Sequence, residues 1–138
     1  MSNGYGEMIC PICGTVATEL HHMVFRKQVK ALENCKLNHI YLCAECHRGT
    51  NGVHGKEGHD LDRKLKLQFQ NKLEFLFNKQ YLSRKDIKET LGIKDNATDS
   101  LCKLIKQEKG MFTREDVIRA CMGGRIIIQE DIKWIHRI

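Results

Sequence analysis

Two adjacent histidines, His21 and His22, lie between apolar residues in the stretch TELHHMVF. A histidine in such surroundings is most often a satisfied core residue, and a pair would then place one ring in the core and the other in water. The neighbouring motifs favour chemistry instead, because C-P-I-C precedes the pair and C-A-E-C-H follows it. Imidazole ionises near physiological pH, so it suits proton transfer as well as metal binding.

Four cysteines form two C-x-x-C pairs, Cys10 with Cys13 and Cys43 with Cys46, separated by 29 residues. Each pair can place two thiolates on one metal from a tight turn, and four thiolates make a closed tetrahedral zinc site. Redox pairs are the alternative for this spacing. The sequence therefore predicts one structural Zn²⁺. The remaining cysteines have no such partner and are predicted to be small buried apolar residues: Cys35, Cys102 and Cys121.

The N-terminus, MSNGYGEMIC, lacks the basic and apolar regions of a signal peptide. No apolar run approaches the length of a membrane span, so we expect no membrane partner. The protein is expected to be cytoplasmic. In that compartment the chain's seven cysteines would serve metal binding rather than a disulfide framework.

The composition changes near Leu61. Residues 1–60 have only short apolar stretches and predict a loop-rich module with two brief strands, too small to fold by apolar burial alone. Residues 61–80 repeat apolar side chains at helical spacing and predict one long amphipathic helix, with a basic segment extending to residue 82. The sequence thus predicts a third region, 83–138, that is mostly helical.

Capping signals divide this third region. Ser83 with Asp86 and Gly92 predicts one capped helix, and a second helix is expected to end at Gly110. Thr113 predicts the start of another, which ends at the Gly123-Gly124 pair. The tail beyond it is expected to form a short strand and a last turn or helix. The pair of helices in 83–110 is either a helix-turn-helix that reads the major groove or a helical cap that completes a core.

The formal charge of +6 is unevenly distributed. Residues 1–60 hold six basic and six acidic side chains, whereas residues 61–88 hold eight against three, an excess of +5. Residues 89–138 hold nine against eight. A basic segment of this density fits either a solvated helix face or a polyanion such as DNA. The candidate contacts to the DNA backbone are Lys64, Lys66 and Lys72.

The motifs resemble, in their order, the His-Asn-His (HNH) endonucleases of the zinc-containing ββα-metal type, and the phage-associated members look particularly similar. The shared pattern is C-x2-C, H-H, N-x4-C-x2-C-H and covers about residues 8–60. The resemblance implies an α+β fold, in which a small zinc-stapled ββα-metal nuclease module at 1–60 precedes the helical region. It also implies a bacterial or phage-infected cell as the setting.

The resemblance assigns a role to each matching residue. His22 matches the general base, while His21 and His47 match ligands of one catalytic divalent metal. Asn38 matches the middle residue of the motif, which ties the loop between the strands and helps to orient the base. Successive side chains on a strand point to opposite sides, so His21 can face the metal while His22 faces the substrate. The family's products carry 5′-phosphate and 3′-hydroxyl ends.

Two features depart from the family pattern. Many members have an aspartate where this chain has His21, and an all-imidazole site suits Mn²⁺, Ni²⁺ or Zn²⁺ better than Mg²⁺. The R-G-T-N-G run between His47 and His54 disfavours a continuous helix. His54 is therefore expected either to ligate the metal from a loop or to contact phosphate. The remaining histidines are expected to be surface or core residues: His39, His59 and His136.

The leading hypothesis is thus a metal-dependent DNA endonuclease (a phosphodiester hydrolase). The alternative is a zinc-stabilised DNA-binding or adaptor protein without catalysis, which would need neither the histidine pair nor His47. An interaction protein built on a decayed nuclease scaffold is a third reading, and the sequence leaves it open.

Overall fold

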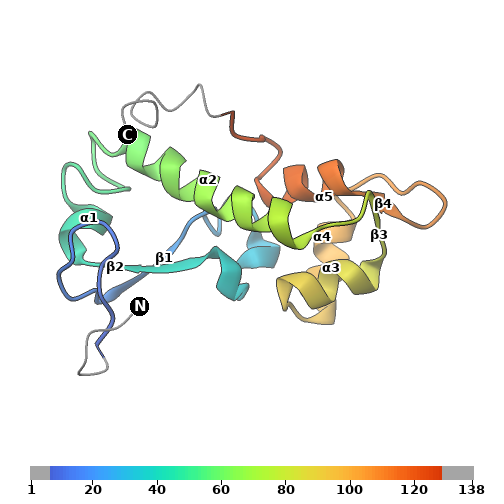
Figure 1. Cartoon of the computed structure of the whole chain (residues 1–138), viewed down its shortest axis with the longest axis horizontal. Helices are drawn as coiled ribbons and strands as arrows, with labels where there is room; N and C mark the ends of the chain where they lie inside the picture. Colours follow the sequence, from blue (N-terminus) through green and yellow to red (C-terminus); the bar gives the residue numbers. More distant parts are fainter. Residues whose placement is uncertain (1–6, 129–138) are drawn as a thin grey trace. The chain divides into compact units, whose positions relative to one another are not determined.

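A computed structural model describes residues 7–128 (Figure 1). The chain consists of two compact units. The described part of unit one comprises 7–23, 39–65 and residue 128, and unit two comprises 24–38 and 66–127. The described residues form five α-helices and two small antiparallel sheets. The expected α+β class is therefore confirmed. No helix in 7–128 is both long enough and apolar enough to cross a membrane.

Unit one is built on a β-hairpin. Strands β1 (Glu19–His22) and β2 (His39–Leu42) pair antiparallel, and Figure 1 shows them side by side. Helix α1 (Ala44–Arg48) follows β2 after one residue, Cys43, which caps it. The expected pair of brief strands is present, and a short helix follows the second strand in the chain.

A tightly wound loop follows α1 and contains four glycines between residues 49 and 58. A Cβ atom on Gly55 would lie 1.9 Å from the carbonyl oxygen of Gly49, so only glycine allows these turns to approach so closely. The N–H of His54 donates to the carbonyl oxygen of His47 at 3.0 Å. The loop therefore folds back on the end of α1 and brings the two histidines together.

Helix α2 spans His59–Leu76, and the boundary between the units falls within it. It starts earlier than the expected residue 61, since Asp60 and Asp62 in its first turn favour the helix N-terminus. It also ends earlier than the expected residue 80. The guanidinium of Arg114 donates to the carbonyl oxygens of Glu74 and Phe77, which terminates the helix. The basic segment expected to extend the helix to residue 82 instead ends in strand β3.

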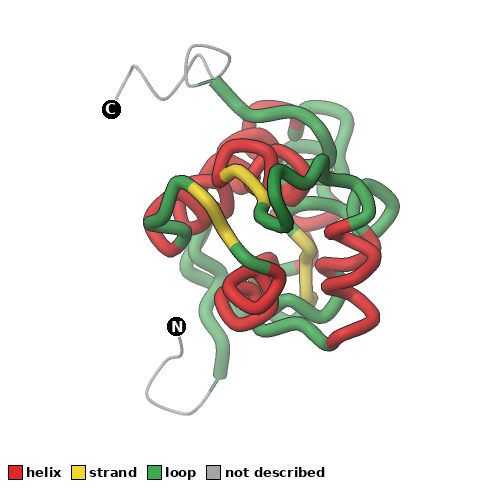
Figure 2. Tube along the Cα trace, turned by 90° about the vertical axis from the view of Figure 1, so that its right-hand side faces the viewer, coloured by secondary structure: helices red, strands yellow, loops and turns green. Residues whose placement is uncertain are grey.

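Unit two continues with short elements. Figure 2 shows the helices, strands and loops of the chain in different colours. Strands β3 (Tyr81–Leu82) and β4 (Phe112–Thr113) pair antiparallel. Between them lie α3 (Arg84–Leu91) and α4 (Asp95–Cys102), and α5 (Arg114–Cys121) follows β4. Two 3-10 turns, Lys30–Leu32 and Lys36–Asn38, belong to this unit through loop 24–38.

The caps predicted from the sequence are confirmed. Ser83 and Asp86 form a reciprocal capping box, Gly92 ends α3 in the left-handed conformation, and Thr113 accepts a hydrogen bond from the N–H of Asp116. These local signals suffice because each cap satisfies backbone groups within a few residues of itself. The core of unit two contains buried apolar side chains from all of its helices, among them Phe69, Ile87, Leu101 and Val117.

The helix expected to reach Gly110 is shorter, since α4 ends at Cys102. Lys109 and Gly110 both have positive φ, at 55° and 78°, and reverse the chain in a two-residue hairpin turn. Residues 125–128 have no regular structure, so the described part of the expected tail strand is absent. The rest of that tail, the predicted last helix and His136 lie outside the described residues.

Candidate metal centres

The four cysteines of the two C-x-x-C pairs come together in unit one. The sulfur atoms of Cys10, Cys13, Cys43 and Cys46 all lie within 4.8 Å of one another, and those of Cys13 and Cys43 are 3.5 Å apart. Tetrahedral zinc with Zn–S bonds of about 2.3 Å needs sulfurs roughly 3.8 Å apart. The cluster can therefore hold a structural metal such as zinc.

Local turns position these thiols. The N–H of Gly14, whose φ is 80°, donates to the carbonyl oxygen of Cys10 at 2.9 Å, which curls the first pair. The second pair is held by the start of α1, where the sulfur of Cys43 accepts from the N–H of Cys46 at 3.4 Å. Both turns follow from sequence neighbours, which is why the cysteine spacing alone predicted the cluster.

The thiols of this cluster differ in acidity. The backbone N–H of Cys46 lowers the pKa of Cys43, and the hydroxyl of Thr15 lowers that of Cys13. Burial, followed by hydrogen bonding to Cys43, raises the pKa of Cys46. Four thiolates repel one another, so full ionisation of the set requires a cation at its centre. The donor set therefore fits a divalent metal better than four independent thiols.

A second group of metal-binding side chains consists of His21, His47 and His54. One ring nitrogen from each lies within 4.8 Å of the others, and the ring centroids are 4.8–5.0 Å apart. His21 is buried, His47 is half-buried and His54 is exposed. Because His54 is exposed and only three imidazoles converge, a metal held there would keep a coordination position for a further ligand, unlike a metal in a closed four-ligand structural site.

His54 lies in a loop, as expected from the sequence. Helix α1 ends at Arg48, and His54 reaches the cluster from the glycine-rich loop. Of the two roles expected for His54, its position beside His21 and His47 fits that of a ligand. The spacing H-x6-H did not reveal this, because only the folding back of the loop brings the ring to the other two.

Glu19 is a residue of this site that the sequence analysis missed. Its carboxylate lies 2.7 Å from Nδ1 of His47 and forms a two-pronged pair with Arg48 at 2.7–3.1 Å. Arg48, and after it His47, lower the pKa of Glu19 to about 2, so the carboxylate is ionised at neutral pH. An ionised acceptor at Nδ1 leaves Nε2 of His47 as the nitrogen available to a metal. The signal in the sequence was its place two residues before His21, on the same side of β1.

We expect Glu19→Gln to weaken metal binding at the histidine cluster by about 10- to 100-fold, because the amide orients His47 less strongly than a carboxylate does. Titration with Co²⁺ or Ni²⁺, after zinc has filled the cysteine cluster, would measure it. The matched control is Glu45→Gln on the exposed surface of α1, which should bind as tightly as wild type. Equal affinities for both variants would remove Glu19 from the site.

His22 and Asn38 lie around the same hairpin but not in the histidine cluster. The ring of His22 contacts that of His39, its cross-strand partner, at 4.8 Å between centroids. The buried side chain of Asn38 accepts from the N–H of Val24 at 2.7 Å and donates to its carbonyl oxygen at 2.8 Å. Val24 and Asn38 are the two ends of loop 24–38, so Asn38 closes the loop that connects the strands.

The three candidate DNA-binding lysines differ in their surroundings. Lys64 is half-buried in unit one, and Lys72 is exposed in unit two. The ammonium of Lys66 lies 4.0 Å from the centroid of the Phe25 ring, which engages its charge within unit two. The excess of basic side chains is not confined to α2. Unit two holds 17 basic and nine acidic side chains, whereas the described residues of unit one hold four basic and six acidic ones.

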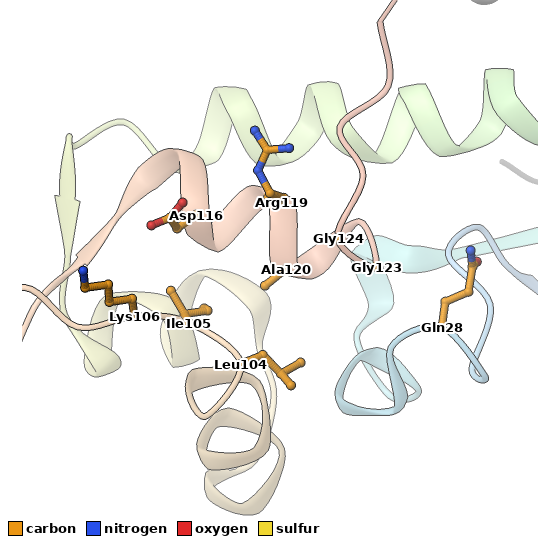
Figure 3. Close-up of a pocket in the computed structure, with 9 residues that line it drawn as sticks. All are labelled: Gln28, Leu104, Ile105, Lys106, Asp116, Arg119, Ala120, Gly123 and Gly124. Atoms are coloured by element: carbon orange, nitrogen blue, oxygen red, sulfur yellow. The ribbon is translucent and has the colours of Figure 1, made fainter.

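Unit two also contains a cavity of about 520 Å³ lined by the segment 104–106, α5 and Gln28 (Figure 3). Lys106 and Arg119 contribute positive charge there, although Arg119 is paired with Glu115 at 2.9 Å. Among the described residues, the metal-binding groups are the cysteine and histidine clusters of unit one, and neither borders this cavity. The candidate metal-binding groups among the described residues thus lie in unit one.

The remaining cysteines belong to unit two. Cys35 and Cys121 are fully buried, and Cys102 is half-buried. Burial raises the pKa of all three thiols. The expected burial is thus confirmed for two of them, and the third is partly exposed.

Comparison with protein-family models, with curated proteins and with solved structures finds no match to this chain.

Proposed function

We propose that this protein is a metal-dependent DNA endonuclease, which hydrolyses phosphodiester bonds to 5′-phosphate and 3′-hydroxyl ends. The observation that carries the proposal is the cluster of His21, His47 and His54, gathered from β1, α1 and the following loop. In a ββα-metal reading, β1, β2 and α1 form the module, and the cysteine cluster staples it. The resemblance to HNH endonucleases rests on these same residues.

The proposed roles follow from position. His22, next in the chain to His21, takes the proton from the attacking water, because a neutral imidazole is an effective base near neutral pH. His21, His47 and His54 hold one divalent metal, with Glu19 orienting His47. When bound, that metal neutralises charge on the phosphate and stabilises the leaving oxygen. Asn38 keeps the loop between the strands closed and so fixes the hairpin that carries His22.

Three imidazoles and no carboxylate ligand favour particular metals. Imidazole suits Zn²⁺, Ni²⁺ and other late first-row ions, and Mg²⁺ prefers oxygen ligands. We therefore place Mn²⁺, Ni²⁺ and Zn²⁺ ahead of Mg²⁺ as the catalytic metal. The cysteine cluster, with four sulfur ligands, is assigned to structural Zn²⁺.

The charge distribution supports DNA as the partner. Unit two has a formal charge of +8, and described unit one has a charge of −2. Binding to phosphates is driven by such an excess and carries little sequence information. Lys64 and Lys72 of α2 remain proposed contacts to the DNA backbone. The other basic side chains of unit two are further candidates for such contacts.

A zinc-stabilised DNA-binding protein without catalysis would share the cysteine cluster and the basic unit. It would have no use for three converging imidazoles with one side open to solvent. The histidine cluster therefore favours the nuclease over the adaptor.

We expect the purified protein to nick supercoiled plasmid when Mn²⁺, Ni²⁺, Zn²⁺ or Mg²⁺ is added, with the weakest activity in Mg²⁺. EDTA should stop the reaction, since the charge on the phosphate is then not neutralised. Gel electrophoresis of nicked and linear plasmid, and end-labelling for 5′-phosphate, measure both outcomes. Failure to cleave supercoiled, single-stranded or branched DNA with any of the four metals would overturn the proposal.

A further inference from the structure

The hairpin of unit one has two chemically different faces. Side chains alternate along a strand, so Glu19 and His21 share one face, where both contact His47. Leu20 and His22 share the other face, opposite Tyr41 and His39 in the pairing register. Leu20 is 39% exposed and Tyr41 is 41% exposed, so this second face presents apolar and aromatic surface to solvent.

A cavity of about 240 Å³ adjoins this face. It is lined by three residues next to Cys10 in the chain and by three residues of β2: Met8, Ile9, Pro11, His39, Ile40 and Tyr41. None of the six is an aspartate, glutamate, lysine or arginine. A phosphate would find no fixed cation here, whereas a flat uncharged group would find apolar walls and two aromatic rings.

His39 connects the cavity to the proposed base. Its ring lines the cavity and also meets the ring of His22 edge-on, with centroids 4.8 Å apart and planes at 77°. A nucleotide's base is separated from its own phosphate by a single sugar. A phosphate held at His22 therefore places a neighbouring base within reach of this cavity.

We infer that the cavity, with Tyr41 and His39, binds one unstacked nucleobase beside the scissile phosphate, so that the substrate is DNA with an unpaired base at the cleaved position. The inference rests on the proposed function and deepens it. A base in continuous duplex is stacked and paired on all sides and cannot enter a pocket without being extruded. A single-stranded base needs no such extrusion and stacks on aromatic side chains with little regard to sequence.

The charge distribution is consistent with this division of tasks. The +8 of unit two serves the phosphate backbone, and the cavity on unit one, which has a charge of −2 over its described residues, offers stacking instead. Stacking sites on aromatic residues are the usual means of holding single strands without sequence preference.

The experiment uses duplex oligonucleotides with one unpaired base at a fixed position, which carry the fluorescent base 2-aminopurine at the unpaired position or at each neighbouring position in turn. The full-length protein is titrated without added divalent metal, and gels confirm that the DNA stays intact. Zinc analysis confirms that the cysteine cluster is filled. We expect quenching to be concentrated at one position for wild type. Tyr41→Ala should abolish this quenching and lower affinity by about 10-fold, as loss of one base–aromatic stack does.

Two variants serve as controls. Tyr41→Phe keeps the ring and should retain both quenching and affinity, which also separates the effect from a folding defect. Tyr81 is a similarly exposed tyrosine (45%) on β3 of unit two, and Tyr81→Ala should behave like wild type. An abasic residue at the quenched position offers an independent measure. It should lower wild-type affinity as Tyr41→Ala does and have no further effect in that variant.

The outcomes separate this inference from the proposed function. Position-specific quenching that depends on Tyr41, in a protein that cleaves no DNA with any metal, would uphold the base site and overturn the nuclease. Cleavage with equal quenching in Tyr41→Ala and wild type would do the reverse. Equal cleavage of intact duplex and single strands also overturns the base site. So does a change from dimer to monomer in Tyr41→Ala with unaltered DNA binding, since the face would then join two copies of the chain.

Discussion

His22→Ala should lower the single-turnover rate of DNA cleavage by about 100- to 10,000-fold, the usual contribution of a general base. Its DNA affinity and zinc content should equal those of wild type, because His22 belongs to neither metal cluster. The effect should persist at saturating catalytic metal, since the missing group takes a proton and does not bind the ion. Cleavage rates across a metal titration, with binding measured separately, provide the test.

Two comparisons make this result specific. His47→Ala removes one of three clustered imidazoles, so its activity should partly recover as the metal concentration rises. His59→Ala changes an exposed histidine at the start of α2 and should cleave as wild type does. A His22→Ala protein that cleaves at the wild-type rate would show that another group takes the proton.

Cys43→Ser should lose the tightly bound zinc and unfold unit one. The two strands of this unit have four residues each and α1 has five, which is little structure to bury apolar surface. Structural zinc contributes on the order of 10–16 kcal/mol of apparent binding free energy in small zinc-dependent folds, so its loss outweighs typical domain stability. Metal analysis after extensive dialysis and amide NMR spectra of unit one report the two effects.

The choice of serine isolates the metal from the helix cap. Cys43 caps α1 through its sulfur, and a serine hydroxyl caps a helix N-terminus at least as well. Cys102→Ser in unit two, where the thiol is half-buried, is the matched control and should keep its zinc. A wild-type protein that stays folded without zinc would contradict the staple, as would a Cys43→Ser variant that still holds one equivalent.

The Glu19 carboxylate should contribute to the stability of the fold in a defined direction with pH. The pKa of Glu19 is held at about 2 by Arg48 and His47, below its ordinary value of 4.5. A carboxyl group whose pKa falls on folding stabilises the fold above about pH 4.5, and this contribution disappears as the pH falls toward 2. The pair with exposed Arg48 is a surface ion pair, so its role lies in orienting His47 more than in stability.

Several features of this protein were determined by short stretches of sequence. The two C-x-x-C pairs predicted the cysteine cluster, because each pair forms its own turn and one metal can join two turns. The predicted caps at Ser83, Gly92 and Thr113 are confirmed, because a cap and the backbone groups it satisfies are neighbours in the sequence. Local chemistry acts within a few residues, and the sequence displays it directly.

Other features were decided only by the tertiary structure. Arg114 ends α2 from a position far along the chain, so the apolar periodicity of that helix overstated its length. Loop 24–38 groups with unit two, although both of its flanking strands belong to unit one.

The histidine site shows the same division most clearly. His21 and His47 were expected as ligands, but the place of His54 depends on how a glycine-rich loop folds back on α1. Glu19 and His39 gain their neighbours from α1 and from the pairing of β1 with β2. These contacts of Glu19, His39 and His54 join residues from different elements, so they depend on how the elements of the unit pack together.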